Sequence, residues 1–190
     1  LGTMKVLVSV RDRLKGTVYC AFEEGEETNC GIEAMIQALE KYPIDRCMAL
    51  HVYNMLEAGK VNLVPGPRMA GTVRIGFHLK GKSGHGSRPD QAISPIIPGA
   101  HIISEINSAF NNQLNIEETV TLGFGMFAAG TAWNIIPDDA YITGNARYFD
   151  PVEGDKAFAL INRTIKNVAE IHRCGVEFDP THRISPLPVV

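Results

Sequence analysis

The chain has 190 residues, of which 45% are hydrophobic and 21% charged, and its net charge is -3. This composition is typical of a globular protein with one domain or two small ones, and it excludes disordered and fibrous classes. The short, mixed cluster of Arg11, Arg13 and Lys15 does not indicate nucleic-acid binding, and no apolar run approaches the roughly 18 residues needed to cross a bilayer.

The first 68 residues predict part of a parallel α/β sheet. Residues 1–13 read as the end of a helix, and residues 16–22 (GTVYCAF) as a buried strand. Residues 29–42 (NCGIEAMIQALEKY) have apolar side chains at helical spacing, and residues 46–53 (RCMALHVY) read as a second buried strand. Strand, helix and strand make a βαβ unit, and ligands bind at the carboxyl ends of such strands.

The pattern changes after the Gly- and Pro-rich segment EAGKVNLVPGPRMAG, so we place a hinge near residues 66–71. The elements predicted beyond it are a strand (72–81), a helix (94–112), two strands (118–129 and 138–149), a helix (153–173) and a strand (175–179). This βαββαβ order is the ferredoxin-like arrangement. We therefore expect an incomplete catalytic domain at 1–68, a second domain at 69–181, and a return segment at 182–190.

The four cysteines form no C-x-x-C pair, which argues against a structural zinc site or a redox motif. The first ten residues also lack the basic region of a signal peptide. We therefore expect free thiols in a cytoplasmic protein with a small-molecule ligand and neither a nucleic-acid nor a membrane partner.

The stretch CAFEEGEETNC places Glu23, Glu24, Glu26 and Glu27 within five positions after the first predicted strand. Their mutual repulsion would be relieved by a cation. Because neighbouring parallel strands end at the same edge of a sheet, Glu27 and His51 could ligate one metal ion there. A solvated acidic loop, with His51 packed against backbone, is the structural alternative, and the spacing alone leaves both open.

A second group of polar residues lies in the other domain. His85 sits in a Gly-rich turn (GKSGHGSRP), Asn134 at the mouth of the central hairpin, and Arg147 near the far end of the following strand. An imidazole, an amide and a guanidinium on one sheet could bind a carboxylate or an oxyanion. The alternatives are a turn histidine, a turn asparagine and a surface arginine.

Taken together, the motifs resemble the zinc-dependent aminoacylase and carboxypeptidase superfamily, which includes hippurate hydrolase, carboxypeptidase G and succinyl-diaminopimelate desuccinylase. The similarity is greatest to the N-acyl-amino-acid amidohydrolase branch and runs from about Leu14 to the end of the chain. The motifs that show this similarity occur in the same order as in the family. They are GTVYCAFEEGEE, GIEAMI, ALHVY, KGKSGHGSRP, GTAWNIIPD and GNARYFD. The fold class implied is a partial parallel-sheet α/β catalytic domain of zinc-peptidase type plus a ferredoxin-like α+β lid and dimerisation domain.

In the catalytic domain, the resemblance implies a Glu-Glu pair whose first member is the general base and whose second member is a metal ligand. That pair corresponds to Glu26 and Glu27, while Glu23 and Glu24 are a rival register. His51 matches a metal-binding histidine. The cofactors implied are two divalent metal ions, with zinc favoured over manganese or cobalt.

In the lid, His85 matches a histidine that reaches into the partner's active site of a homodimer and stabilises the oxyanion. Asn134 and Arg147 match residues that bind the substrate carboxylate or assist at the scissile carbonyl. The reaction implied is hydrolysis of the amide bond of N-acyl amino acids or small aminoacyl substrates with a free carboxylate.

The family pattern also requires an upstream histidine or cysteine with a bridging acid and a downstream histidine, and these 190 residues contain none in the expected context. We therefore expect the chain to hold half of a two-metal site and to be inactive alone. Two alternatives remain. The chain could be a non-catalytic dimerisation or interaction module, or a binding protein for acidic ligands that acts without a metal.

Overall fold

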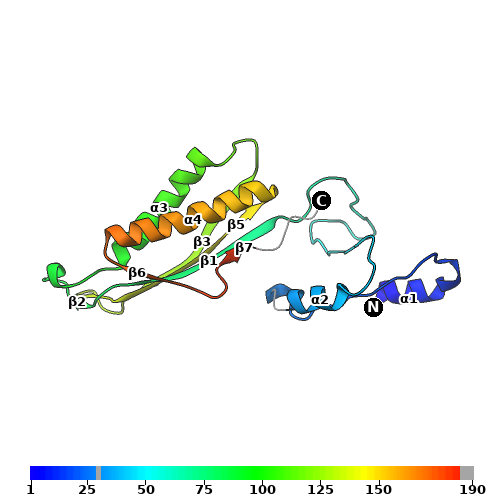
Figure 1. Ribbon diagram of the computed structural model, residues 1–190, viewed down its shortest axis with the longest axis horizontal. Helices are drawn as coiled ribbons and strands as arrows, with labels where there is room; N and C mark the ends of the chain where they lie inside the picture. The colour runs from blue at the N-terminus through cyan, green and yellow to red at the C-terminus, as the bar shows by residue number, and fades with distance from the viewer. Residues whose placement is uncertain (29–30, 185–190) are drawn as a thin grey trace. The chain divides into compact units, whose positions relative to one another are not determined.

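The computed structural model describes residues 1–28 and 31–184 (Figure 1). The chain divides into two compact units, Leu1–Val61 and Asn62–Val190, and each is described by itself. The start of the predicted 29–42 helix and most of the predicted return segment, residues 185–190, lie outside the described residues.

The described residues of the first unit form two short α-helices and two 3-10 helices. These elements are α1 (Gly2–Ser9), η1 (Arg11–Arg13), η2 (Glu26–Thr28) and α2 (Ile32–Leu39). The helices expected at the start of the chain and around residue 35 are thus present in the described residues.

The prediction of buried strands at 16–22 and 46–53 is wrong, because the structure describes both segments and has no strand in either. Their apolar side chains face solvent: Met48 is 90% exposed and Val52 89%. None of the described residues 1–61 is buried. A strand forms only where neighbouring strands pair with its backbone and a packed layer covers its side chains, and this unit offers neither.

The second unit is a mostly antiparallel sheet with two helices on one face (Figure 1). The strand order is β3 (Val120–Ala129), β5 (Asp139–Tyr148), β1 (Gly71–Lys80) and β6 (Gly175–Phe178), and β7 (Arg183–Ile184) also pairs with β1. The covering helices are α3 (Ile96–Gln113) and α4 (Pro151–Ile171). The predicted βαββαβ order is confirmed.

The sheet has one apolar and one polar face because apolar and polar residues alternate along β1. Its buried residues face the helices and form the core with residues of β5, α3 and α4. The contributors from β1 and the two helices are Val73, Ile75, Phe77, Leu79, Ile102, Ile106, Phe110, Ala157, Leu160, Ile161, Ile165 and Ala169. The other sheet face carries polar residues such as His78 and Lys80.

The start of α4 is fixed by a cap and by a close contact. The Asp150 carboxylate accepts a hydrogen bond from the Glu153 backbone N–H at 2.9 Å, and Pro151 occupies the first helical position. A side chain at Gly154 would place its Cβ 2.6 Å from the Tyr148 ring. Only glycine therefore allows α4 to lie this close to β5.

His182, between β6 and β7, fastens the chain back onto the sheet. Its Nδ1 accepts a hydrogen bond from the Gly76 N–H at 3.3 Å, and its Nε2 donates to the Asn162 side-chain oxygen at 3.0 Å. The ring also lies against Phe158 and Phe178. Burial lowers the pKa of His182 to about 4, so the neutral ring is the form that fits.

Candidate functional site

His85 and Asn134 come together at one end of the second unit. Two short strands, β2 (Gly84–His85) and β4 (Ile135–Ile136), pair antiparallel there, with His85 opposite Ile135. The Gly86 N–H donates a hydrogen bond to the Asn134 carbonyl at 2.8 Å. We call this paired region, residues 84–86 and 130–136, the lid tip. It places the predicted imidazole on β2 and the predicted amide in the turn directly before β4.

Two glycines allow the lid tip to close on itself. A Cβ at Gly86 would lie 3.2 Å from the Asn134 carbonyl oxygen, and one at Gly84 would lie 2.7 Å from the Ala92 side chain. In the structure they bring two parts of this chain together, which holds His85 in place.

The base of the lid tip is held by side chains at the end of the main sheet. The Lys80 ammonium lies 2.8 Å from the Asp139 carboxylate, and the His78 Nδ1 lies 3.0 Å from it. Burial alone would raise the pKa of Asp139, but the hydrogen bonds from Lys80 and His78 lower it, so the carboxylate stays ionised. The Ser83 hydroxyl adds a hydrogen bond to the Ile136 carbonyl at 3.0 Å.

The His85 ring is exposed, and Ser87 fixes which nitrogen carries the proton. The Ser87 backbone N–H donates to the His85 Nδ1 at 3.2 Å, and the Ser87 hydroxyl lies 2.8 Å from the same nitrogen. A backbone N–H can only donate, so Nδ1 accepts and the neutral ring carries its proton on Nε2. His85 therefore offers an outward N–H, as an oxyanion donor must. The sequence analysis missed Ser87, although its place two residues after a histidine in a turn is a usable signal.

The structure does not bring Arg147 to His85 and Asn134 within one chain. Arg147 pairs with Thr72 at one end of the sheet and donates a hydrogen bond to its hydroxyl, whereas the lid tip follows Lys80 at the other end. The eight residue-to-residue steps from Thr72 to Lys80 span about 26 Å of extended strand. The guanidinium is exposed at this distant position.

Glu26, Glu27 and His51 lie in the first unit, and all three are exposed. Glu26 and Glu27 begin η2, whereas His51 lies in a segment without helix or strand. The His51 Nδ1 lies 2.5 Å from the Val52 carbonyl oxygen. Since a carbonyl only accepts, Nδ1 carries the proton and Nε2 keeps the lone pair that a metal ligand needs.

A complete metal site is not present in the described part of the chain, where no three His, Cys, Asp or Glu side chains are grouped to hold an ion. The carboxylate of Glu27 and the imidazole of His51 are chemically suited to zinc, manganese or cobalt, but two ligands do not make a site. Their joint role therefore remains a prediction.

Three cysteines, Cys20, Cys47 and Cys174, are free thiols, and Cys30 lies outside the described residues. Burial raises the pKa of the Cys174 thiol, so it is not a reactive thiolate. No helix within residues 1–28 and 31–184 has the length and apolar character needed to cross a membrane.

Residues 66–173, more than half of the chain, match the family model of the peptidase dimerisation domain, M20_dimer. The chain is 32% identical over 179 residues to an N-acyl-L-amino acid amidohydrolase from Geobacillus stearothermophilus, covering 94% of this chain and 48% of that protein. It is 29% identical over 182 residues to thermostable carboxypeptidase 2 from Saccharolobus solfataricus, covering 94% and 46%. The chain thus spans about half the length of these curated relatives.

A solved structure of a tripeptidase from Staphylococcus aureus shares the fold, with a TM-score of 0.51 and 24% identity over 58% of this chain and 28% of that one. The fold, the match to the dimerisation domain and the amidohydrolase and carboxypeptidase relatives agree with the resemblance seen in the sequence. This chain belongs to the M20 aminoacylase and peptidase family.

Proposed function

We propose that this chain is part of a metal-dependent amidohydrolase or peptidase that cleaves N-acyl amino acids or small aminoacyl substrates with a free carboxylate. The relatives named as amidohydrolases and carboxypeptidases support a hydrolase. The observation that carries the proposal is the lid tip, where His85, with its Nε2–H, lies on β2 and Asn134 lies in the turn before the paired strand β4, held by the Gly86 N–H.

His85 and Asn134 would act on the scissile carbonyl. Its oxygen gains negative charge as water attacks, and the His85 N–H donates a hydrogen bond to it. One such donor contributes about 3 kcal/mol to transition-state stabilisation. Because Ser87 and Gly86 fix the two residues in advance, little reorganisation is needed when the charge develops.

In the first unit we propose Glu26 as the general base, which takes a proton from the attacking water and delivers it to the leaving amine. Glu27 and His51 would be ligands of a two-metal centre, with zinc as the proposed ion. The metal ions would supply Lewis acidity. The remaining ligands would come from residues beyond these 190, so we expect the chain alone to bind zinc weakly or not at all.

We also propose a homodimer through the second unit. β3 is the end strand of the described sheet and pairs there only with β5, so one of its backbone edges is open for pairing. Met126 on β3 and Ile97 on α3 add exposed apolar side chains. In this dimer His85 would serve the active site of the partner subunit.

Arg147 is proposed to bind a substrate carboxylate, but not in the active site that His85 of the same subunit serves. The two lie at opposite ends of a sheet about 26 Å long, which is more than a small N-acyl amino acid can bridge. A cytoplasmic location is proposed from the lack of paired cysteines in the sequence pattern.

The test uses the full-length protein, a panel of N-acyl amino acids and dipeptides, and removal of metal by a chelator. We expect hydrolysis that is lost with the metal and restored by zinc. Glu26→Gln should lower kcat by at least about 100-fold, while Glu23→Gln, in the rival register, should lower it by less than about threefold. An equal loss in both variants would refute the assignment of the base.

A non-catalytic dimerisation module is the second candidate, because the second unit holds every buried residue of the described chain and the first unit holds none. A full-length protein that dimerises but hydrolyses nothing in the panel would favour this candidate. Binding of N-acyl amino acids by a metal-free, inactive protein would instead favour a carboxylate-binding role.

A further inference from the structure

Trp133 is the only tryptophan in the chain and is 98% exposed. It lies in the lid tip immediately before Asn134. A large aromatic side chain gains about 1.5–3 kcal/mol or more when it is buried, so its full exposure leaves a favourable contact unmade. The mechanism described above assigns no role to this residue.

The exposure of Trp133 is not the result of a loose loop. The next residue is clamped by the Gly86 N–H, and the Ile135 N–H bonds back to the Ala132 carbonyl at 3.4 Å. The chain after Trp133 continues directly into β4, which is paired with β2. The backbone therefore holds the Cα of Trp133 in place, so the indole projects from a fixed point on the surface.

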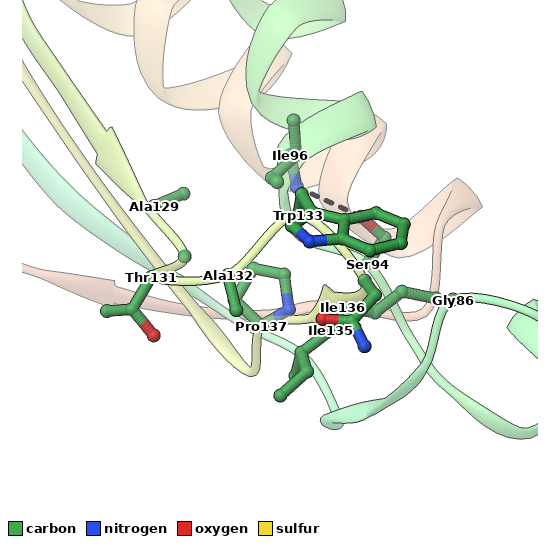
Figure 2. Close-up of a pocket in the computed structure, with 12 residues that line it drawn as sticks. Gly86, Ser94, Ile96, Ala129, Thr131, Ala132, Trp133, Ile135, Ile136 and Pro137 are labelled. Atoms are coloured by element: carbon green, nitrogen blue, oxygen red, sulfur yellow. Dashed lines mark hydrogen bonds between the residues drawn. The ribbon is translucent and has the colours of Figure 1, made fainter.

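The indole lines a shallow pocket of about 560 Å³, which lies within the size range of small-molecule sites (Figure 2). The apolar wall comes from Ile96, Ile135 and Pro137, and Ser94 and Asn134 contribute polar groups. An apolar wall with few polar groups suits a flat hydrophobic ligand group.

We propose that Trp133 is a specificity-determining residue that stacks on an aromatic ring of the substrate. This inference rests on the proposed function. If His85 and Asn134 hold the scissile carbonyl, the groups on either side of that amide lie within reach of an indole one residue from Asn134. The ring can belong to the acyl group or to the amino-acid side chain, since both flank the amide.

The kinetic test compares three substrates of the full-length protein: N-acetylalanine, N-benzoylalanine and N-acetylphenylalanine. In Trp133→Ala, the kcat/KM for a ring-bearing substrate, relative to that for N-acetylalanine, should fall roughly tenfold or more, mainly through KM. Trp133→Phe should keep most of the preference, because it retains an aromatic face. The substrate whose advantage disappears identifies which side of the amide carries the ring.

Ile116→Ala is the matched control, because Ile116 is also almost fully exposed but lies outside the lid tip. It should leave the substrate ratios unchanged. Ratios that are the same in Trp133→Ala as in the wild type would overturn the proposal.

Binding gives a readout that does not need turnover. We compare the tryptophan fluorescence of full-length Glu26→Gln with that of the same protein carrying Trp133→Phe as well. The difference between the two signals comes from the indole of Trp133 alone. We expect N-benzoylalanine or N-acetylphenylalanine to change this signal saturably and N-acetylalanine to leave it unchanged. A signal that is already blue-shifted and insensitive to all three ligands would mean that protein covers the indole, and the proposal would be wrong.

The two measurements separate the failure of this inference from the failure of the proposed function. If the wild type hydrolyses no substrate, the proposed function fails, and the fluorescence titration still decides whether Trp133 binds aromatic rings. If the wild type hydrolyses all three with unchanged ratios in Trp133→Ala, the function stands and the role of Trp133 does not.

Discussion

Acid should destabilise the second unit through His182 before the carboxylates titrate. The folded state lowers the pKa of His182 to about 4, from 6.5 for an unperturbed histidine, chiefly through burial. Its Nδ1 accepts from the Gly76 N–H, and a protonated ring cannot accept that bond. The stabilisation by neutral His182 is therefore complete above about pH 6.5 and declines as the pH falls towards 4. Below about pH 4 this residue changes the free energy of unfolding no further.

The size of the effect follows from the pKa difference. If the whole pKa difference between the folded and unfolded states applied, the free energy of unfolding would fall by roughly 2 kcal/mol between pH 7.5 and pH 5. Because the imidazole keeps some exposure and water screens its charge, we expect roughly 1 kcal/mol. The hydrogen bonds of Asp139 and Asp179 lower their pKa values, so these carboxylates lose their contribution only at lower pH.

The assay is urea denaturation of the chain at pH 7.5, 6.5, 5.5 and 5, compared with His182→Gln, in which the ring cannot titrate. Five other histidines contribute equally to both proteins, so the difference between the two pH slopes isolates His182. The variant should be less stable at pH 7.5 and should have a shallower slope. Identical slopes in the two proteins would refute the reasoning.

Three further predictions concern packing, assembly and metal binding. Gly154→Ala should destabilise the fold by about 1–2 kcal/mol in urea denaturation, because its Cβ would overlap the Tyr148 ring. Gly123→Ala is the control and should cost less, because its Cβ would meet no atom within 4 Å. A larger loss of stability in Gly123→Ala than in Gly154→Ala would contradict this contact. Met126→Lys on the open β3 edge should weaken the dimer at least roughly tenfold by sedimentation velocity, and Ile171→Lys on α4 should not; equal effects would contradict a β3 interface. The 190-residue chain should bind zinc weakly or not at all by calorimetry and hydrolyse no N-acyl amino acid, and tight stoichiometric binding would show that its own ligands suffice.

The second unit could be predicted from the sequence because its pattern is local. Alternation of apolar and polar residues in β1 indicates a two-sided strand, and the cap at Asp150 followed by Pro151 indicates where α4 begins. The closeness of His85 and Asn134 was harder to predict, because it depends on the register of two short strands far apart in the sequence. The tautomer of His85 could be assigned only from the position of Ser87.

The first unit shows where such reasoning fails. Residues 16–22 and 46–53 have the composition of buried strands, but composition does not supply the neighbours that a parallel sheet needs. The sequence placed Arg147 near the far end of its strand, but grouping it with His85 and Asn134 ignored the length of that strand. A guanidinium about 26 Å along the sheet from the end that carries the lid tip cannot share a small ligand with it.

We propose that His85 acts on the substrate amide from the lid of one subunit into the active site of its partner, and mixed dimers test this directly. Full-length Glu26→Gln and His85→Ala, each expected to be nearly inactive as a homodimer, are mixed in equal amounts under conditions that exchange subunits. If His85 acts across the dimer, one active site in each mixed dimer has both residues intact, and about a quarter of wild-type activity should return through random pairing. Activity that stays at the level of the separate variants, although mixed dimers form, would contradict the claim.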